Sequence, residues 1–418
     1  MTAADLLAVG IRELATLAAG PVPRRGEAMS ELGLRHDAAV AVADGRFVWV
    51  GSERAARRAV RLRHGGTRLD LGGASVVPGF VDAHTHALFA GDRSFEVARK
   101  VRGASYAEIA RAGGGIFATV RATRRASDDA LLRAATDRLR RMAASGSTVV
   151  EVKSGYALSH AGELRLLRLL RRLGRRSGVT VVPTYLGAHA VPPEFRGRSD
   201  AYVDEIVRRT IPAVARERLA RFCDVFVEPG FFSARQGARV LRAAAAHGLG
   251  LKVHAEEFVA AGGARLAARL HARSAEHLLV ASADDRDRLA GAGVTAVLLP
   301  ATPFASMTST RSPGRALIDA GVPVAVGTDC SPNSWVEAMP LVLAHAVYGA
   351  RLTPAEALTA ATVNAAHAVD LTDSAGTIAV GRSADFVAFE VPSVAQLGYR
   401  IGLDPVAIYR QGRPVSSR

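Results

Sequence analysis

The sequence predicts an α/β protein built around a (β/α)8 TIM-like barrel, with a small β-sandwich domain formed by its N- and C-terminal segments. Short apolar segments alternate with longer segments rich in Ala, Leu and Arg, as expected for alternating strands and helices. Residues able to do chemistry recur at the carboxyl ends of the apolar segments, where a barrel gathers its active site. The length of 418 residues and apolar content of 49% suffice for a large core.

Eight apolar segments are expected to form the barrel strands. They are SVVPGFVDAH (75–84), STVVEVKSG (147–155), VTVVPTYLG (179–187), RFCDVFVE (221–228), LGLKVHAE (249–256), RSAEHL (273–278), VTAVLLP (294–300) and VPVAVGTD (322–329). The intervening segments, such as AGELRLLRLLRRLG, are long enough for crossover helices. A doubly wound open sheet is the alternative, but it does not predict that the polar residues follow the strand ends.

Two further segments lie outside the eight barrel strands. AAVAVADGRFVWVG (38–51) and GTIAVGRSADFVAFE (376–390) have the pattern of short strands with tight Asp-Gly and Gly-Arg turns. We expect them to pair in one small β-domain, made of residues 1–74 and 371–418, with the barrel spanning 75–370.

The charge is strongly positive, with 54 basic and 39 acidic residues and a formal net charge of +15. Lys100, Lys153 and Lys252 are the only lysines, so nearly all of this charge is arginine. The arginines alternate with leucines in stretches such as residues 164–176, which predicts amphipathic helices with a solvated arginine face. No nucleic-acid-binding module is recognisable, and no nucleic-acid partner is expected.

The sequence also predicts a cytoplasmic protein with no membrane partner. No apolar run approaches the roughly 18 residues that span a bilayer. The first twenty residues carry Asp5, Arg12 and Glu13 in place of the basic start of a signal peptide. Cys223 and Cys330 are the only cysteines, which suits a reducing compartment.

A metal site is expected at the carboxyl ends of the strands. His84-x-His86 ends the first strand and can present two imidazoles to one ion, with Asp82 placed to orient a ligand histidine. His254, ending the fifth strand, and Asp329, ending the eighth, would add a third imidazole and a carboxylate. This ligand set suits zinc or iron with an open position for a water whose pKa falls towards about 7. We expect one Zn2+ or Fe2+/Fe3+ ion per subunit.

Together these positions resemble the signature of the amidohydrolase superfamily, which has His-x-His after strand one, histidines on strands five and six, and Asp on strand eight. Many two-metal members close strand four with a carbamylated lysine. Here Glu228 ends strand four and Lys153 ends strand two. The resemblance therefore implies a mononuclear site, with a second ion bridged by Glu228 as the alternative.

Within the superfamily, the chain is similar to the imidazolonepropionase family over nearly its whole length. The motifs that carry the likeness are DAHTH with GDRSFE, GASYAEIARAGGGIFATVRATR, EVKSGY, YLGAHAVPPE, FCDVFVE, HAEEF, SAEHL and VPSVAQLGYRIGLDPV. The likeness implies hydrolysis of 4-imidazolone-5-propanoate to N-formimidoyl-L-glutamate in histidine degradation. A cyclic amidohydrolase or heterocycle deaminase with another substrate is the alternative, and a non-catalytic barrel is disfavoured because all four metal ligands are present.

The resemblance also implies a set of substrate contacts. The small-molecule substrate has a carboxylate tail, and Arg93 of GDRSFE can bind a carboxylate through two parallel hydrogen bonds. Tyr156 of EVKSGY and His189 of LGAHA match family residues that contact the substrate and can hydrogen-bond its ring. Without the resemblance, Tyr156 would be interpreted as a core residue and Arg93 as a surface ion pair.

Glu257 and His277 compete for proton transfer. A carboxylate near the metal-bound water can accept its proton and deliver it to the leaving nitrogen. We expect Glu257 to bind and orient the substrate ring, while His277 and Asp329 act on the water.

One segment departs from the family pattern. Many members read Asn-Pro-Gly-Ser after the metal-binding Asp, where this chain has Ser331-Pro332-Asn333-Ser334. The resemblance implies that Ser331, Asn333 and Ser334 hold the amino-acid-like end of the substrate. The change is interpreted either as variation within a subfamily or as altered substrate choice. The family further implies a homodimer.

Overall fold

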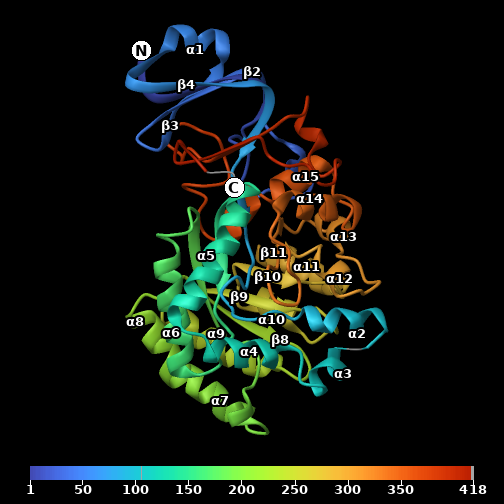
Figure 1. Cartoon of the computed structure of the whole chain (residues 1–418). Helices are drawn as coiled ribbons and strands as arrows, with labels where there is room; N and C mark the ends of the chain where they lie inside the picture. Colours follow the sequence, from blue (N-terminus) through green and yellow to red (C-terminus); the bar gives the residue numbers. More distant parts are fainter. Residues whose placement is uncertain (105, 416–418) are drawn as a thin grey trace.

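The computed structural model describes residues 1–104 and 106–415, without the side chains of residues 106, 107 and 110. It contains an eight-stranded parallel sheet and a separate seven-stranded sheet (Figure 1). The eight parallel strands follow one another in sequence order, each paired with the next. They are β5 (Phe80–Asp82), β6 (Ser147–Lys153), β7 (Thr180–Ala188), β8 (Phe222–Val227), β9 (Gly250–Ala255), β10 (Ser274–His277), β11 (Thr295–Leu298) and β12 (Val324–Val326). All eight predicted barrel strands are present.

The barrel closes between its first and last strands, just beyond their carboxyl ends. Thr85 and Cys330 form an isolated parallel bridge. The backbone N–H of His86 donates to the Cys330 carbonyl at 3.0 Å, and that of Asp329 donates to the His84 carbonyl at 3.1 Å. The predicted (β/α)8 barrel is therefore confirmed, and its closing bonds lie among the residues expected to bind metal.

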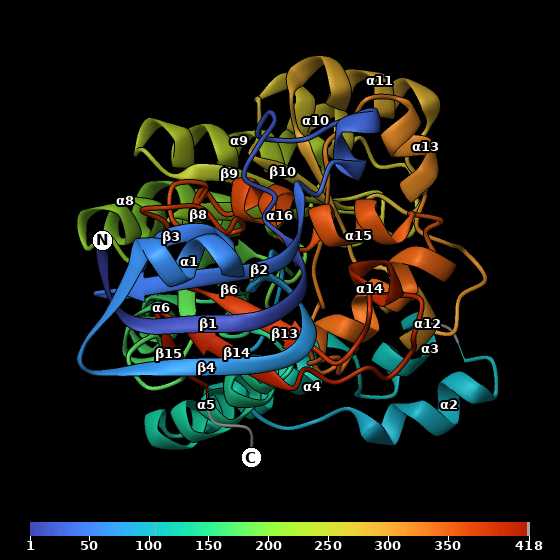
Figure 2. The same ribbon diagram turned by 90° about the horizontal axis from the view of Figure 1, so that it is seen from above.

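Helices surround the barrel and connect its strands (Figure 2). They are α2 (Val97–Val101), α3 (Tyr106–Arg111), α4 (Ile116–Arg125), α5 (Asp128–Ala144), α6 (His160–Leu173), α7 (Ser199–Glu205), α8 (Ile211–Arg216), α9 (Ala234–Ala246), α10 (Gly263–Arg269), α11 (Ala283–Ala292), α12 (Thr302–Ala305), α13 (Gly314–Asp319), α14 (Met339–Tyr348), α15 (Pro354–Ala360) and α16 (Val363–Ala368). No helix in the described part of the chain is long and apolar enough to cross a membrane.

Helix α6 shows why the arginine-rich segments are helical. Ser159 caps its first turn by accepting a hydrogen bond from the Gly162 backbone N–H. Its leucines recur with helical spacing and are buried, whereas Arg168, Arg171 and Arg172 are exposed. The predicted amphipathic helix with a solvated arginine face is confirmed here.

The two chain ends form the predicted small β-domain as one continuous sheet in the order β15-β14-β13-β4-β1-β2-β3. Its strands are β1 (Thr2–Ala15), β2 (Leu34–Ala43), β3 (Arg46–Ser52), β4 (Val60–Pro78), β13 (Phe386–Phe389), β14 (Ala407–Arg410) and β15 (Arg413–Pro414). Helix α1 (Glu53–Ala59) connects β3 to β4. The hairpin predicted over residues 38–51 is present, with positive φ at both Asp44 and Gly45, as a type I′ turn requires.

This sheet differs from the sequence expectation in several details. Strands β1, β14 and β15 and residues 60–74 of β4 were not predicted, and the strand expected over 376–390 is confined to β13. The two predicted segments share one sheet, but β4 and β1 lie between β13 and the β2–β3 hairpin. Residues 75–78 extend β4 and pair with β13 instead of starting the first barrel strand. The chain changes sheets at Gly79, where a side chain would collide with Thr148: a Cβ would lie 2.4 Å from its Oγ1. Glycine is needed there because the backbone approaches β6 so closely.

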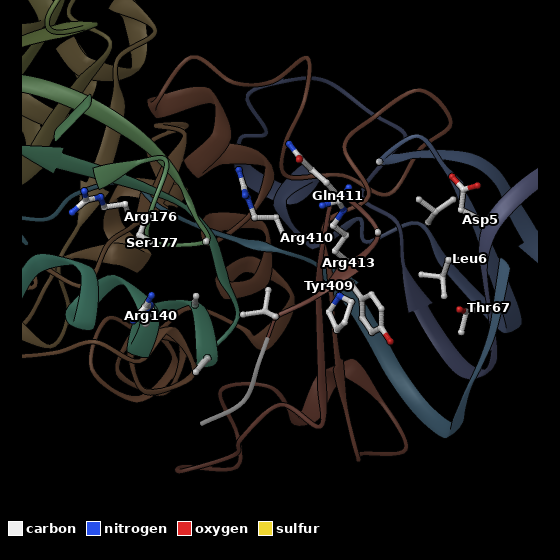
Figure 3. A pocket seen from close by; sticks show the side chains of 18 of the residues that line it. Asp5, Leu6, Thr67, Arg140, Arg176, Ser177, Tyr409, Arg410, Gln411 and Arg413 are labelled. Atoms are coloured by element: carbon white, nitrogen blue, oxygen red, sulfur yellow. The ribbon is translucent and has the colours of Figure 1, made fainter. Parts of the chain in front are cut away.

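A wide groove of about 1330 Å³ lies between the small sheet and the barrel (Figure 3). Arg140, Arg176, Arg410 and Arg413 line it. Arg176 precedes β7, so this groove is at the amino ends of the barrel strands. It contains none of the polar residues that follow the strand ends, and a smaller cavity at the opposite end of the barrel contains most of them.

Candidate active site

Four candidate metal ligands converge at the carboxyl ends of β5, β9 and β12. His84 Nε2 and His254 Nε2 lie 3.2 and 3.4 Å from His86 Nε2. Asp329 Oδ1 lies 3.6 Å from the Nε2 atoms of both His84 and His86. A tetrahedral ion with bonds of about 2.0–2.1 Å separates its ligand atoms by about 3.3 Å. The four side chains are buried. His84, His86 and Asp329 form one group of donors close enough to share an ion, and His84, His254 and His277 form another, so the donors of both groups meet around His84.

His277 lies beside this group on β10. Its ring centroid is 5.5 Å from that of His84 and 5.3 Å from that of His254. Burial, with the nearby charges of His254 and His84, holds the pKa of His277 well below its usual range, so its imidazole is neutral. Both His277 and Asp329 have left-handed backbone conformations, with φ of +70° and +51°. Such strain in non-glycine residues is typical of functional sites.

Carboxylates on other strands of the barrel contact the Nδ1 atoms of two candidate ligand histidines. Glu276 contacts Nδ1 of His84, and Asp224 Oδ2 lies 2.9 Å from Nδ1 of His254. A carboxylate at Nδ1 favours the proton there and leaves Nε2 as the metal-binding atom. Asp82, expected to orient a ligand histidine, contacts His84 only through a long hydrogen bond of 3.5 Å from the His84 backbone N–H, and it accepts shorter bonds from the backbone and hydroxyl of Thr328 at 2.9 and 2.7 Å. Asp82 therefore ties β5 to the chain after β12.

A buried ion network lies beneath these carboxylates. Lys153 Nζ is 2.9 Å from Glu151, Asp224 and Glu276, and Lys252 Nζ is 2.9 Å from the other oxygen of Glu276. All five side chains are fully buried. Burial opposes the charge of Lys153, but the three carboxylates outweigh it and raise its pKa well above the usual range. The network fixes the groups that orient the metal ligands.

Most of this network is not predicted by the sequence. The pattern places Lys153 at a strand end without a role, and it does not distinguish Glu151, Asp224, Lys252 or Glu276. The available signal was a charged residue inside an otherwise apolar strand segment, because an isolated buried charge is costly and needs a partner.

The cavity above the metal ligands brings together nearly all the predicted substrate contacts. Its lining includes His86, Arg93, Tyr156, His189, His254, Glu257, His277, Asp329, Ser331 and Asn333. Ser334 is fully buried and does not line the cavity. Its backbone N–H donates to Ser331 Oγ at 3.1 Å, so it shapes the turn that carries Ser331.

Arg93 is held in place by a carboxylate of the chain itself. Its Nε and Nη2 donate to Glu96 Oε1 and Oε2 at 2.8 and 2.7 Å, and both side chains are buried. Glu96 also accepts a hydrogen bond from the Gly115 backbone N–H at 2.7 Å. The sequence motif predicted the cavity position of Arg93 but not this bidentate ion pair.

His189 presents a neutral acceptor to the cavity. Its Nδ1 donates to the Gly155 carbonyl at 3.1 Å, which leaves Nε2 without a proton in the neutral ring. Burial and the charge of His254 lower the pKa of His189 to about 3. The ring stacks on His86 with centroids 5.0 Å apart, and Tyr156 packs beside it.

Buried glutamates hold the loops that carry Tyr156 and Glu257. Glu163 accepts hydrogen bonds from the backbone N–H groups of Gly155, Ala157 and Leu158 at 2.8, 2.9 and 2.7 Å. Glu228 accepts one from Val259 at 2.9 Å. Glu228 does not belong to any group of donors able to share an ion among the described residues.

Glu257 lies at the edge of the group of candidate metal ligands. Its Oε2 is 3.7 Å from His277 Nε2. Burial, followed by the charges of Asp329 and Glu228, raises the pKa of Glu257 well above its usual range. A carboxyl group in this environment can carry a proton at neutral pH and pass it to a leaving group.

Comparison with known proteins agrees with this geometry. Residues 75–409 match the model of the amidohydrolase family. The chain is 48% identical over 416 residues to the imidazolonepropionase of Symbiobacterium thermophilum, covering 99% of this chain and 97% of that one. It is 45% identical to the imidazolonepropionase of Geobacillus kaustophilus, covering 94% and 93%. An adenosine deaminase from Xanthomonas campestris with bound zinc shares the fold, with a TM-score of 0.71, 19% identity, and coverage of 99% and 93%.

Proposed function

The chain belongs to the amidohydrolase family and within it to the imidazolonepropionases, and on this basis we propose that it hydrolyses 4-imidazolone-5-propanoate to N-formimidoyl-L-glutamate, a step in histidine degradation. The reaction breaks a carbon–nitrogen bond of a cyclic amide. One observation carries the proposal: a single cavity joins the convergent metal donors to Arg93, a cation suited to a carboxylate tail.

One metal ion per subunit, Zn2+ or iron, is part of this proposal. Three imidazole nitrogens and one carboxylate oxygen, from His84, His86, His254 and Asp329, would hold it. When bound, the ion supplies Lewis acidity at the floor of the cavity. Glu276 and Asp224 support the proposal, because their contacts at Nδ1 leave the Nε2 atoms available as ligands.

The cavity side chains account for recognition of the substrate. Arg93 directs the carboxylate tail, and Glu96 fixes the guanidinium orientation. His189 Nε2 accepts a hydrogen bond from a ring N–H, and this role fits the tautomer set by the Gly155 carbonyl. Tyr156 packs against His189 and His86 and forms one wall beside the ring.

Glu257 and His277 have different roles in this proposal. A neutral His277 can accept a hydrogen bond from the attacking water, since its pKa lies well below its usual range. Glu257, whose pKa is raised, can orient the substrate ring through hydrogen bonds from its carboxyl group, a role that a glutamine amide can also fill. Asp329 completes the arrangement because its second oxygen accepts a hydrogen bond from Thr302 Oγ1 at 2.9 Å and is thereby fixed.

The test is hydrolysis of freshly generated imidazolone propionate, followed by the loss of its ultraviolet absorbance and by mass spectrometry of the product. We expect formation of formimidoyl-glutamate, loss of activity on chelation, and recovery with Zn2+ or Fe2+. Arg93→Gln should raise KM for this substrate strongly. No turnover by metal-loaded protein, together with hydrolysis of an uncharged cyclic amide or amidine that is insensitive to Arg93→Gln, would overturn the proposal.

A further inference from the structure

We propose that Lys100 supplies the net positive charge that selects the carboxylate tail of the substrate, and that Asn333 positions its ammonium group at the edge of the cavity. The inference rests on the proposed function. Lys100 does not itself line the cavity, and it acts through Asn333, which does.

The charge of Arg93 is balanced within the protein. Glu96 engages its guanidinium through two hydrogen bonds of 2.8 and 2.7 Å, and the two side chains are buried together. This pair has no net charge, so it offers an incoming carboxylate directional hydrogen bonding but little long-range attraction. A second cation near the pair is needed if the site is to favour an anion over a neutral group of the same shape.

Lys100 is that cation. It lies on α2, four residues after Glu96, and is half-buried. Its Nζ donates to Asn333 Oδ1 at 3.0 Å and to the Asn333 carbonyl at 3.4 Å. Both acceptors are neutral, and among the described residues no carboxylate lies within ion-pair distance of this ammonium. Burial, and then Arg93, lower the pKa of Lys100, which agrees with a desolvated ammonium close to the Arg93–Glu96 pair.

Asn333 connects this charge to the cavity. It lines the cavity together with Arg93, His86 and Asp329, and its side-chain amide donates to Ser306 Oγ at 3.4 Å. The contact therefore joins segments that follow β5, β11 and β12, which are neighbours where the barrel closes. The competing explanation is that the Lys100–Asn333 hydrogen bonds only hold these segments together and have no electrostatic role. The electrostatic and the purely structural explanation make different predictions.

Lys100→Gln separates them, because a glutamine amide can still donate to Asn333 while the charge is lost. The probes are imidazole-4-propionate, which has the carboxylate tail, and 4-propylimidazole, which lacks it. Binding to the metal-loaded protein is measured by isothermal titration calorimetry at low and high salt. We expect Lys100→Gln to lower the affinity for the carboxylate probe about tenfold at low salt and less at high salt, and to leave the affinity for the neutral probe unchanged.

Lys100→Arg should restore most of the affinity for the carboxylate probe. Arg99→Gln removes an exposed charge from the same helix and should have little effect on either probe. If Lys100→Gln weakens binding of both probes equally, the contact is only structural. If it weakens binding of neither probe, Lys100 has no part in recognition. Each result overturns the inference. Calorimetry needs no turnover, so binding and hydrolysis can be judged separately. If the wild type binds the carboxylate probe in a Lys100-dependent way but does not hydrolyse imidazolone propionate, only the proposed function is overturned.

Discussion

Replacing Glu163 by glutamine should loosen the loop that carries Tyr156. One carboxylate oxygen of Glu163 accepts the N–H groups of Ala157 and Leu158, and the other accepts that of Gly155. A glutamine has one acceptor oxygen and one amino group. Its oxygen will stay with the two N–H groups, which leaves its own donor facing the Gly155 N–H.

The size of the effect follows from these three bonds. An unsatisfied buried N–H costs about 1–3 kcal/mol, and the two remaining bonds lose the extra strength that a charged acceptor provides. We expect Glu163→Gln to lower the free energy of unfolding by about 2–4 kcal/mol and Glu163→Ala by more, since all three N–H groups then lose their partner. Gly155 also accepts from His189 Nδ1, so the displacement reaches the substrate-binding imidazole.

Urea unfolding followed by tryptophan fluorescence measures the stability change, and steady-state hydrolysis measures KM. KM should rise in both Glu163 variants, with the metal content unchanged because the ligands lie on other strands. A Glu163→Gln protein with wild-type stability and wild-type KM would show that the three hydrogen bonds do not hold this loop, and the reasoning would be refuted.

Three further predictions concern the buried ion network beneath the candidate metal ligands, the roles of Glu257 and His277, and the pH dependence of stability. Lys153→Met should lower the free energy of unfolding by about 3–5 kcal/mol and weaken metal affinity by about 10–100-fold, because three buried carboxylates lose their shared cation; denaturant titration and metal competition test this. Glu257→Gln should retain turnover and His277→Ala should lose it in the steady-state assay, and the reverse order would exchange their roles. Burial and Arg273 lower the pKa of His367 to about 4, so the unfolded chain binds more protons between about pH 6.5 and 4. Stability should fall by about 1–2 kcal/mol as pH drops through that window, allowing for partial exposure, and His367→Gln should remove this loss in denaturation measured against pH.

The sequence contained enough information for the barrel and for the convergence of the candidate metal ligands. Strand and helix periodicities differ, so eight apolar segments separated by helix-length segments specified the strands. Once the strands were placed in a parallel barrel, the histidines at their carboxyl ends had to meet, since all such ends lie on one face. Arg93 and Tyr156 needed the family resemblance, because nothing in their local pattern distinguishes them from ordinary surface or core residues. His189 directly follows a barrel strand, so its position was predicted from the pattern and only its contact with the substrate needed the resemblance.

The network of buried charges could not be predicted from local pattern. Hydrophobic periodicity treats a charged residue in a strand as exposed, whereas Lys153 is neutralised by carboxylates from three strands that meet only in the closed barrel. The contact between Lys100 and Asn333 joins positions 233 residues apart. Strand β1 lacks a strict alternation of buried and exposed residues, because its register shifts against both of its neighbours, β2 and β4.

The distribution of lysine determines how the protein reacts with reagents that modify amines. All but three of its 54 basic residues are arginines, and Lys153 and Lys252 are sealed beneath the metal cluster. Apart from the chain's α-amino group, an acylating dye or an activated resin finds only Lys100, whose lowered pKa makes its amine more nucleophilic at neutral pH. A single reporter could thus be attached without mutagenesis beside Asn333, which lines the active-site cavity. Immobilisation through the same chemistry would tether the protein on that side.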